Sequence, residues 1–288
     1  MRTGFLLLAV LLAGAACDRA PDHRGPRTRA SLIAAGDVAS CWWRADEATA
    51  RLIDGMDGVV AALGDLVYQA GTEDQFRDCY VPTWGRHLDR TRPTLGNHDR
   101  RTRRGAAYYR LFGARAGEPG KGWYSYELDG WHVVVLNSEE DMKPGSPQLR
   151  WLEADLRAHP TTCTLAYMHR PLFSSGKHGG SARVRDAWRV LYAGGVDVVL
   201  AGHDHHYERF AALTPDGERD PARGIVSFVI GTGGAPLYAV DEPGPHSLAH
   251  QNRVHGVVAF RFAPDRYEWE FVPVRSAGYA DRGTARCH

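Results

Sequence analysis

Five short apolar stretches of this chain each run directly into a polar side chain that can bind a metal ion. In chain order these side chains are Asp37, Asp65, Asn97, His169 and the pair His203 and His205. Ligands of open α/β sheets gather in the crevice beyond the carboxyl ends of the strands. One Gly-Asp after a strand is usually only a turn, but five such endings in one chain indicate a single shared site.

The segments around these endings alternate between strand-like and helix-like patterns. Strands are predicted for residues 32–35, 59–63, 93–95, 165–168, 196–200 and 225–230, and helices for residues 47–53, 106–112, 149–158 and 183–193. Residues 124–136 predict a hairpin that turns at Asp129-Gly130, and residues 257–271 predict a β-rich segment with a turn at Pro264-Asp265. This alternation predicts one α/β domain of about 250 residues, which is large for a single domain.

The charged residues nearly cancel, with 35 Lys and Arg against 34 Asp and Glu. The content of 43% hydrophobic and 24% charged residues is that of an ordinary globular protein. A balanced global charge gives no support for binding to a bulk membrane surface, or to nucleic acid other than as a substrate.

The first 16 residues predict a secretory signal peptide. Arg2 supplies its positive end, residues 5–12 are apolar, and residues 13–16 are small and suited to cleavage. The apolar run is too short to span a bilayer as a permanent helix. An N-terminal core helix is the weaker alternative, because a Pro- and Arg-rich linker follows at residues 17–29. We therefore predict an exported protein, periplasmic or extracellular, whose folded domain is residues 30–288.

Export permits disulfides, and five cysteines leave one unpaired. Cys17 follows the small residues, where a bacterial lipoprotein carries its lipidated cysteine, but Gly14 stands where such a signal has leucine. Simple secretion and membrane anchoring through a lipid on Cys17 both remain open. The other four cysteines allow three pairings, of which we favour Cys41–Cys79 and Cys163–Cys287. The first would join two loops of the site, and the second would attach the C-terminal tail to a central strand.

The site motifs together resemble those of the calcineurin-like metallophosphoesterases. They are Gly36-Asp37, Gly64-Asp65-x-x-Tyr68, Gly96-Asn97-His98-Asp99, His169 and Gly202-His203-x-His205. Within that family the chain is most similar to the purple acid phosphatases, because of Tyr68 and of Tyr207-Glu208-Arg209. The resemblance runs from Arg29 to about Pro273 and implies a four-layer α/β/β/α sandwich of two mixed β-sheets flanked by helices. The chain departs from the large plant enzymes in having no room for their N-terminal β-domain, and in carrying Asp99 where they have glutamate.

The resemblance also implies two metal ions that share one carboxylate. Asp37, Asp65, Tyr68 and His205 would hold the first ion, and Asn97, His169, His203 and the shared Asp65 would hold the second. Carboxylates and a phenolate suit Fe(III), whereas imidazoles and an amide oxygen suit a divalent ion such as Zn, Mn or Fe(II). The alternative for Tyr68 is a tyrosine that only packs in the core.

Three further residues are candidates for catalysis. The leaving alkoxide needs a proton, and His98, oriented by Asp99, is the first candidate for donating it or for binding phosphate. The alternative is that His98 only orients Asn97. His178 lies nine residues after His169 and matches a substrate-contacting histidine of purple acid phosphatases, with a solvated loop histidine as its alternative.

We therefore predict an exported, metal-dependent phosphoric-ester hydrolase that is similar to acid phosphatases. It would hydrolyse small phosphate monoesters through attack by a metal-bound hydroxide. One alternative is a phosphodiesterase or nucleotidase that uses the same two metals. The other is a surface binding protein with a decayed site. The sequence leaves the natural substrate, the second metal and the oligomeric state open.

Overall fold

The structure, a computed structural model of the whole chain, describes Met1 and residues 31–240, 242–275 and 279–288. The predicted signal peptide beyond Met1, the linker and Cys17 lie outside these residues. Within the described part of the chain, no helix combines the length and the apolar character that crossing a membrane requires.

The first β-sheet is mixed and has the strand order β13-β12-β11-β1-β2-β3. Its strands are β1 (Leu32–Ala35), β2 (Val59–Ala62), β3 (Thr91–Pro93), β11 (Gly256–Ala263), β12 (Arg266–Pro273) and β13 (Arg282–Arg286). β1, β2 and β3 run parallel, whereas β11 is antiparallel to β1 and continues into the antiparallel β12 and β13. The carboxyl ends of β1, β2 and β3 therefore meet at the same edge of the sheet.

The second β-sheet is also mixed, with the order β10-β8-β9-β7-β6-β5-β4. Its strands are β4 (Tyr124–Leu128), β5 (Trp131–Val135), β6 (Thr164–Tyr167), β7 (Val198–Ala201), β8 (Tyr207–Phe210), β9 (Val226–Ile230) and β10 (Ser247–Gln251). β5, β6, β7 and β9 are parallel, and β4, β8 and β10 pair antiparallel to their neighbours. The ends of β6 and β7 thus share an edge.

Side chains on the central strands of the second sheet alternate between two buried clusters, as the two-residue period of a strand requires. Val133 and Val135 of β5 lie in a cluster that also holds residues of β1, β2 and β11. Val134 lies in a cluster formed with α5 (Pro147–Ala158) and α6 (Arg185–Ala193). The sheets also touch directly, because Trp131 of β5 stacks on Phe262 of β11 with ring centroids 4.4 Å apart.

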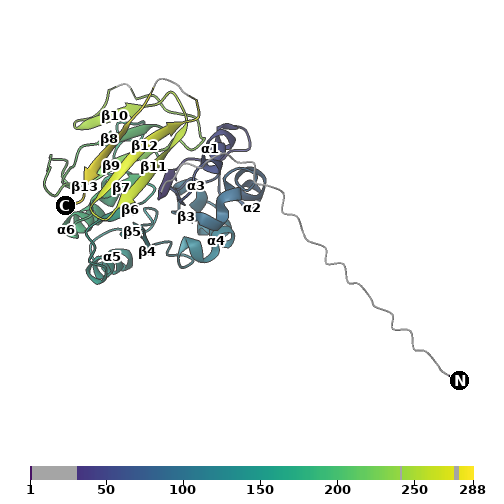
Figure 1. Cartoon of the computed structure of the whole chain (residues 1–288), viewed down its shortest axis with the longest axis horizontal. Coiled ribbons are helices and arrows are strands. Elements are labelled where there is room, and N and C mark those ends of the chain that lie inside the picture. The colour runs from purple at the N-terminus through teal and green to yellow at the C-terminus, as the bar shows by residue number, and fades with distance from the viewer. Residues whose placement is uncertain (2–30, 241, 276–278) are drawn as a thin grey trace.

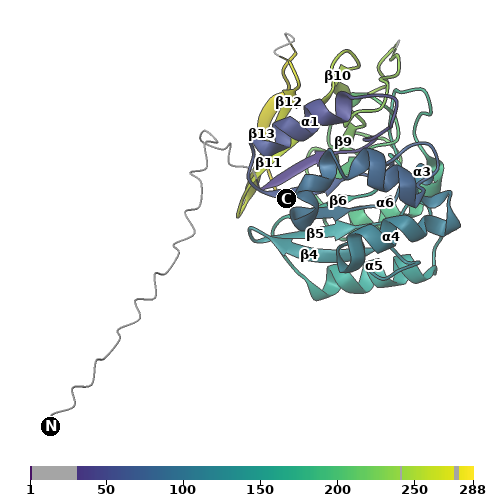
Figure 2. The same cartoon turned by 90° about the vertical axis from the view of Figure 1, so that its right-hand side faces the viewer.

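Helices cover the outer sides of both sheets. Helix α1 (Ala45–Asp54) packs against β11 of the first sheet, and α5 and α6 pack against the second. Figure 2 shows α1 beside β11 and β12 at one side of the molecule and α5 beyond β4 and β5 at the other. This arrangement confirms the expected four-layer α/β/β/α sandwich.

Shorter helices occupy the loops between β2 and β4, and Figure 1 shows α2, α3 and α4 gathered on one side of the molecule. The short α-helices are α2 (Glu73–Gln75), α3 (Asn97–Arg100) and α4 (Ala106–Phe112). The others are the π-helix η1 (Phe76–Tyr80) and the 3-10 helices η2 (Trp84–Arg90), η3 (Arg103–Gly105) and η4 (Gly113–Ala116). A further 3-10 helix, η5 (Ala182–Val184), lies between β6 and β7, directly before α6.

The predicted hairpin and both favoured disulfides are present. Asp129 and Gly130 have φ angles of 51° and 82°, and two consecutive positive values define the turn that matches the twist of a hairpin. Cys41–Cys79 joins the loop after β1 to η1. Cys163–Cys287 joins the residue after β13 to the residue before β6.

The structure corrects the strand predictions in two ways. The strand expected at residues 93–95 lies earlier, because β3 ends at Pro93. The apolar pattern also fails to predict β8, β10 and β13, whose sequences YERF, SLAHQ and RGTAR carry polar or charged side chains. β10 and β13 are edge strands, and an edge position does not require an apolar run.

Candidate metal centre

The predicted site residues come from both sheets. Asp37, Asp65 and Asn97 follow β1, β2 and β3 of the first sheet, and Tyr68 lies in the loop after β2. His169 follows β6, and His203 and His205 follow β7 of the second sheet. The side chains of Asp37, Asp65, Tyr68, His169, His203 and His205 are all buried. The site therefore lies where the carboxyl ends of parallel strands from the two sheets meet.

The backbone is left-handed at three of these positions. Asp37, Asp65 and His203 have φ angles of 59°, 49° and 74°, which is uncommon for residues with a side chain and costs on the order of 1–3 kcal/mol each. The glycine before His203 is required by close packing, because a Cβ on Gly202 would lie 2.6 Å from Asp37 Oδ2. Strain and close approach of this kind concentrate at functional sites.

One group of donor atoms converges on the Tyr68 hydroxyl. Its Oη lies 2.9 Å from Asp37 Oδ1, 2.9 Å from His205 Nε2 and 3.4 Å from Asp65 Oδ2. His205 Nε2 is also 3.3 Å from Asp37 Oδ1. These four side chains are the set predicted for the first metal, and the structure brings all four together.

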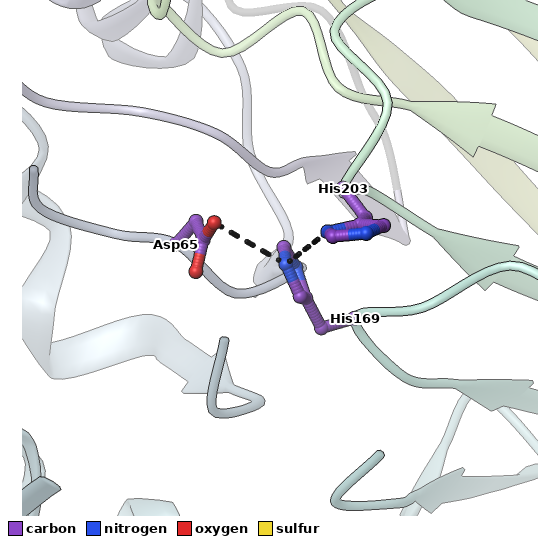
Figure 3. A group of neighbouring side chains, drawn as sticks. All are labelled: Asp65, His169 and His203. Atoms are coloured by element: carbon purple, nitrogen blue, oxygen red, sulfur yellow. Dashed lines mark hydrogen bonds and ion pairs between the residues drawn. The ribbon is translucent and has the colours of Figure 1, made fainter. Parts of the chain in front are cut away.

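A second group of donor atoms converges on His169. Its Nε2 lies 3.3 Å from Asp65 Oδ2, 3.2 Å from Asn97 Oδ1 and 3.2 Å from His203 Nδ1. Figure 3 shows the Asp65 carboxylate and the His203 ring on either side of the His169 ring. Asp65, His169 and His203 each present a ligand atom, and these atoms all lie within 4.8 Å of one another. This group matches the set predicted for the second metal.

Asp65 belongs to both groups through a single oxygen. Its Oδ2 faces Tyr68 on one side and His169 on the other. Its second oxygen, Oδ1, accepts the backbone N–H of His98 at 2.7 Å. The carboxylate is thus held in place with one oxygen directed between the two groups.

The imidazole rings are oriented by bonds on their far sides. His169 Nδ1 lies 2.9 Å from the Leu63 carbonyl oxygen, and His205 Nδ1 lies 2.8 Å from the Pro236 carbonyl oxygen. A carbonyl oxygen can only accept, so both Nδ1 atoms donate and both Nε2 atoms are directed into the site. Metal-binding histidines commonly have such a partner, so the donor set fits bound metal ions.

The charges of the buried cluster perturb its histidines and its tyrosine. Burial would lower the pKa of His169, but the Asp65 carboxylate outweighs it and raises that pKa to about 10. Burial, with the charges of His169 and Arg170, lowers the pKa of His203 to about 2. Burial and the charge of Asp37 raise the pKa of Tyr68 well above its ordinary value. A phenolate at Tyr68 therefore requires a strong positive charge beside it.

His98 lies at the rim of the site, with 18% of its side chain exposed. Its Nδ1 lies 2.7 Å from the Gln69 carbonyl oxygen and must donate to it. Its Nε2 lies 3.9 Å from Asp65 Oδ2, and its ring packs on that of Tyr68 with centroids 4.4 Å apart. The free nitrogen of His98 therefore faces the donor groups.

Asp99 does not orient His98, contrary to the sequence-based expectation. Its Oδ1 accepts the backbone N–H groups of Leu66 and Val67 at 2.9 and 3.2 Å, and its Oδ2 accepts that of Gly96 at 3.0 Å. Burial and the nearby Asp65 charge raise the pKa of Asp99 to about 7. The carboxyl group holds the loop after β2 against the loop after β3, because its acceptors are used by backbone donors.

His178 lies over the second donor group. Its ring stacks on His203 with centroids 4.7 Å apart, and its Nδ1 lies 3.0 Å from Asp204 Oδ1. Its side chain is 41% exposed, whereas Asp204 is fully buried. His178 is thus a partly exposed ring attached to the site by a buried carboxylate.

Sequence reasoning missed two side chains at the site. Arg170 donates to Asn97 Oδ1 at 3.1 Å and lies 3.0 Å from His203 Nε2. The Tyr238 ring stacks on His205 with centroids 4.0 Å apart. Arg170 directly follows His169, and that adjacency was the available signal. Tyr238 lies beyond β9 in a loop with no apolar or motif pattern to mark it.

A second group of metal-binding residue types lies elsewhere, among the described residues. It consists of His132 in β5 and Asp155 in α5, with His159 just after α5. The rings of His132 and His159 stack in parallel, with centroids 4.5 Å apart and planes 12° apart. The lone pairs of an imidazole lie in its ring plane, so two parallel rings do not direct them at one ion.

Comparison with known proteins agrees with this geometry. The calcineurin-like phosphoesterase family model matches residues 31–207. Probable purple acid phosphatase 20 of Arabidopsis thaliana is 32% identical over 161 residues, which cover 51% of this chain and 37% of that protein. Purple acid phosphatase 15 of the same plant is 27% identical over 272 residues, which cover 79% of this chain and 51% of that protein. The chain thus spans about half or less of the length of these relatives.

A solved structure has the same fold. The purple acid phosphatase PPD1 from yellow lupin seeds superimposes with a TM-score of 0.66 and 17% identity, covering 88% of this chain and 54% of that one. The family match spans more than half of the 288 residues and contains every side chain of both donor groups. The chain therefore belongs to the calcineurin-like phosphoesterase family and is similar, within it, to the purple acid phosphatases.

Proposed function

We propose that this chain is a dinuclear metal-dependent hydrolase of phosphate monoesters. The observation that carries the proposal is the single Asp65 oxygen that faces two groups of donor atoms at 3.4 and 3.3 Å. A carboxylate in that position is suited to bridging two adjacent metal ions, as two-metal phosphoesterases require.

The two donor groups suit different ions. Asp37, Asp65 and Tyr68 offer hard anionic oxygens, with His205 as the nitrogen donor, and this set fits Fe(III). His169, His203 and the Asn97 amide oxygen share Asp65 and fit a divalent ion, namely Zn, Mn or Fe(II). Burial and the charge of Asp37 raise the pKa of Tyr68, so a phenolate at this position would need a metal ion beside it.

Two bound metal ions would supply Lewis acidity to the phosphoryl group and lower the pKa of a coordinated water. The chain itself supplies the proton for the leaving alkoxide. His98 donates its Nδ1–H to Gln69 and presents Nε2 to the site, so Nε2 is placed to donate a proton or to bind a phosphoryl oxygen. His178, held by Asp204, adds a second donor on the open side.

We further propose that the protein is exported, to the periplasm or the cell exterior. Two disulfides are present, and structural disulfides persist in oxidising compartments. Lipidation of Cys17, and with it membrane anchoring, remains an alternative to simple secretion.

The testing experiment is metal analysis with a visible absorption spectrum on protein purified without chelator, followed by assays on two esters. We expect two metals per chain, one of them iron, and a broad visible band. We also expect faster turnover of p-nitrophenyl phosphate than of bis(p-nitrophenyl) phosphate. Tyr68→Phe should abolish the band, whereas Tyr238→Phe, which changes a ring stacked on His205, should keep it.

The other outcomes separate the alternatives. Two metals without a visible band, together with preferred cleavage of the bis-ester, would favour a phosphodiesterase or nucleotidase. Protein without bound metal would contradict the proposal and favour a binding protein with a decayed site.

A further inference from the structure

Arg170 directly follows His169 and points its guanidinium at the second donor group. Its Nη2 donates to Asn97 Oδ1 at 3.1 Å, and its Nη1 lies 3.0 Å from His203 Nε2. Its backbone N–H donates to Ser138 Oγ at 3.1 Å. Arg170 therefore contacts two of the side chains proposed to hold the second metal without itself being able to bind one, since a guanidinium has no acceptor.

Glu139 fixes the direction of this guanidinium. Its Oε1 accepts from Arg170 Nε at 2.6 Å, and its Oε2 accepts from Nη2 at 3.3 Å. The Glu139 side chain is 6% exposed, and that of Arg170 is 21% exposed. Because the carboxylate occupies the Nε side of a planar group, the opposite Nη edge is held toward His203 and Asn97.

The contact between Arg170 and His203 is incompatible with metal binding through His203 Nδ1. Nδ1 is the nitrogen that faces His169 Nε2 in the donor group, at 3.2 Å. A neutral imidazole has one N–H and one lone pair, so a metal on Nδ1 places the proton on Nε2. Nε2 then cannot accept from Arg170, and the Nη1–H of Arg170 needs another acceptor.

We propose that Arg170 is a substrate-binding residue that donates Nη1–H to a phosphoryl oxygen at the second metal and thereby favours dianionic monoesters over monoanionic diesters. This inference rests on the proposed function. An anionic phosphoryl oxygen is the acceptor that a guanidinium fits best. A monoester presents more negative charge and one more terminal oxygen than a diester, so it gains more from this donor.

The test compares Arg170→Met and Arg170→Lys with a matched control, Arg100→Met. Arg100 in α3 is also paired with a glutamate, Glu140 at 3.0 Å, and has 33% of its side chain exposed. Among the described residues, no hydrogen bond or ion pair joins the side chain of Arg100 or of Glu140 to either donor group. On metal-loaded protein, the measurements are metal content, thermal midpoint, the Kd for inorganic phosphate by calorimetry, and kcat/KM for p-nitrophenyl phosphate and its bis-ester.

We expect Arg170→Met to keep both metals and to weaken phosphate binding by about 10- to 100-fold, the effect of losing a hydrogen bond to a charged group. The kcat/KM for the monoester should fall by a similar factor and that for the bis-ester by much less. For Arg170→Lys, the losses in phosphate binding and in kcat/KM should be intermediate. Lysine keeps the positive charge but lacks the planar set of N–H donors of a guanidinium. Arg100→Met should match the wild-type protein in every measurement.

Three results would overturn the inference. They are an unchanged phosphate Kd, an equal loss for both esters, and loss of metal from Arg170→Met, which would make Arg170 a support for Asn97 and His203. Each of these leaves the proposed function standing if the wild-type protein is active. A wild-type protein that binds no metal overturns the proposed function and this inference together.

Discussion

The molecule contains two buried clusters of histidine and aspartate that differ in how their atoms are directed. At the candidate metal centre, the rings of His169 and His203 are 75° apart, and their facing nitrogens lie 3.2 Å from each other. In the second cluster, which we call the His132 cluster (His132, Asp155 and His159), the two rings are 12° apart and stacked. Inclined rings can direct their lone pairs at one point, and stacked rings cannot.

The hydrogen-bond partners of His132 and His169 distinguish the two clusters in the same way. His132 Nδ1 lies 2.8 Å from Glu127 Oε1, and its Nε2 lies 2.7 Å from Asp155 Oδ2. Both nitrogens therefore donate to carboxylates, and the ring is an imidazolium held in an ion pair. His169 instead donates its Nδ1–H to the Leu63 carbonyl oxygen, and its Nε2 is directed into the site. Burial and residue type are thus shared by both clusters, and only the direction of the lone pairs distinguishes a metal centre from a structural ion pair.

The largest expected effect comes from removing the shared carboxylate. Asp65→Ala should release both metals and lower kcat/KM for p-nitrophenyl phosphate by ~1000-fold or more, because the Lewis acidity lost is worth several kcal/mol. Asp155→Asn in the His132 cluster should leave metal content and activity unchanged. Metal analysis and ester assays on both variants measure this difference, and loss of metal from Asp155→Asn would remove the distinction between the clusters.

The His132 cluster should instead contribute to folding. Asp155→Ala leaves a buried imidazolium without its main partner, and breaking a buried ion pair costs about 3 kcal/mol or more. Urea denaturation of metal-free protein should therefore give a lower free energy of unfolding for this variant. His159→Ala is the control, since the side chain is 45% exposed, and it should stay within about 0.5 kcal/mol of wild type. Equal stability of the two variants would contradict the ion-pair interpretation.

His98 should act in catalysis, unlike His132, because only one of its two ring nitrogens is hydrogen-bonded within the described part of the protein. His98 presents Nε2 to the site, so His98→Ala should lower kcat by ~100-fold, as expected for loss of a general acid. Metal content should remain that of the wild-type protein. Steady-state kinetics with metal analysis tests this, and a variant that lost its metals would show that His98 only supports Asn97 and Asp65.

The smallest expected effect is the pH dependence of stability from His132. Burial would lower its pKa, but the hydrogen bonds to Asp155 and Glu127 outweigh burial and raise the pKa above its ordinary value. The stabilisation is therefore fully present below the ordinary histidine pKa, about 6.5, and is lost as pH rises through the folded-state pKa. The free energy of unfolding of wild type minus that of His132→Gln should decline from pH 6 toward alkaline pH. A difference that grew with pH would contradict this sign.

The local pattern predicts the strand ends of the site well. An apolar run followed by glycine and a polar residue places Asp37 and Asp65 beyond β1 and β2, because a strand needs buried side chains and a tight turn needs glycine. His203 follows β7 and Gly202 for the same reason, whereas His169 follows the apolar run of β6 without a glycine. The assignment of these residues to two groups came from the family resemblance and not from the pattern, since spacing carries no information on which strands are neighbours.

The sequence by itself therefore determined which strands end in the candidate ligands Asp37, Asp65, His169 and His203, the alternating α/β order and the hairpin at Asp129-Gly130. Only the tertiary structure decided where the second oxygen of Asp65 goes, that Asp99 bonds to backbone N–H groups, and that Arg170 and Glu139 form a pair beside His203. It also decided that the equally buried His132 forms ion pairs with Glu127 and Asp155. The physical reason is that residue type and strand position depend on nearby residues, whereas the direction of a lone pair depends on contacts between distant segments of the chain.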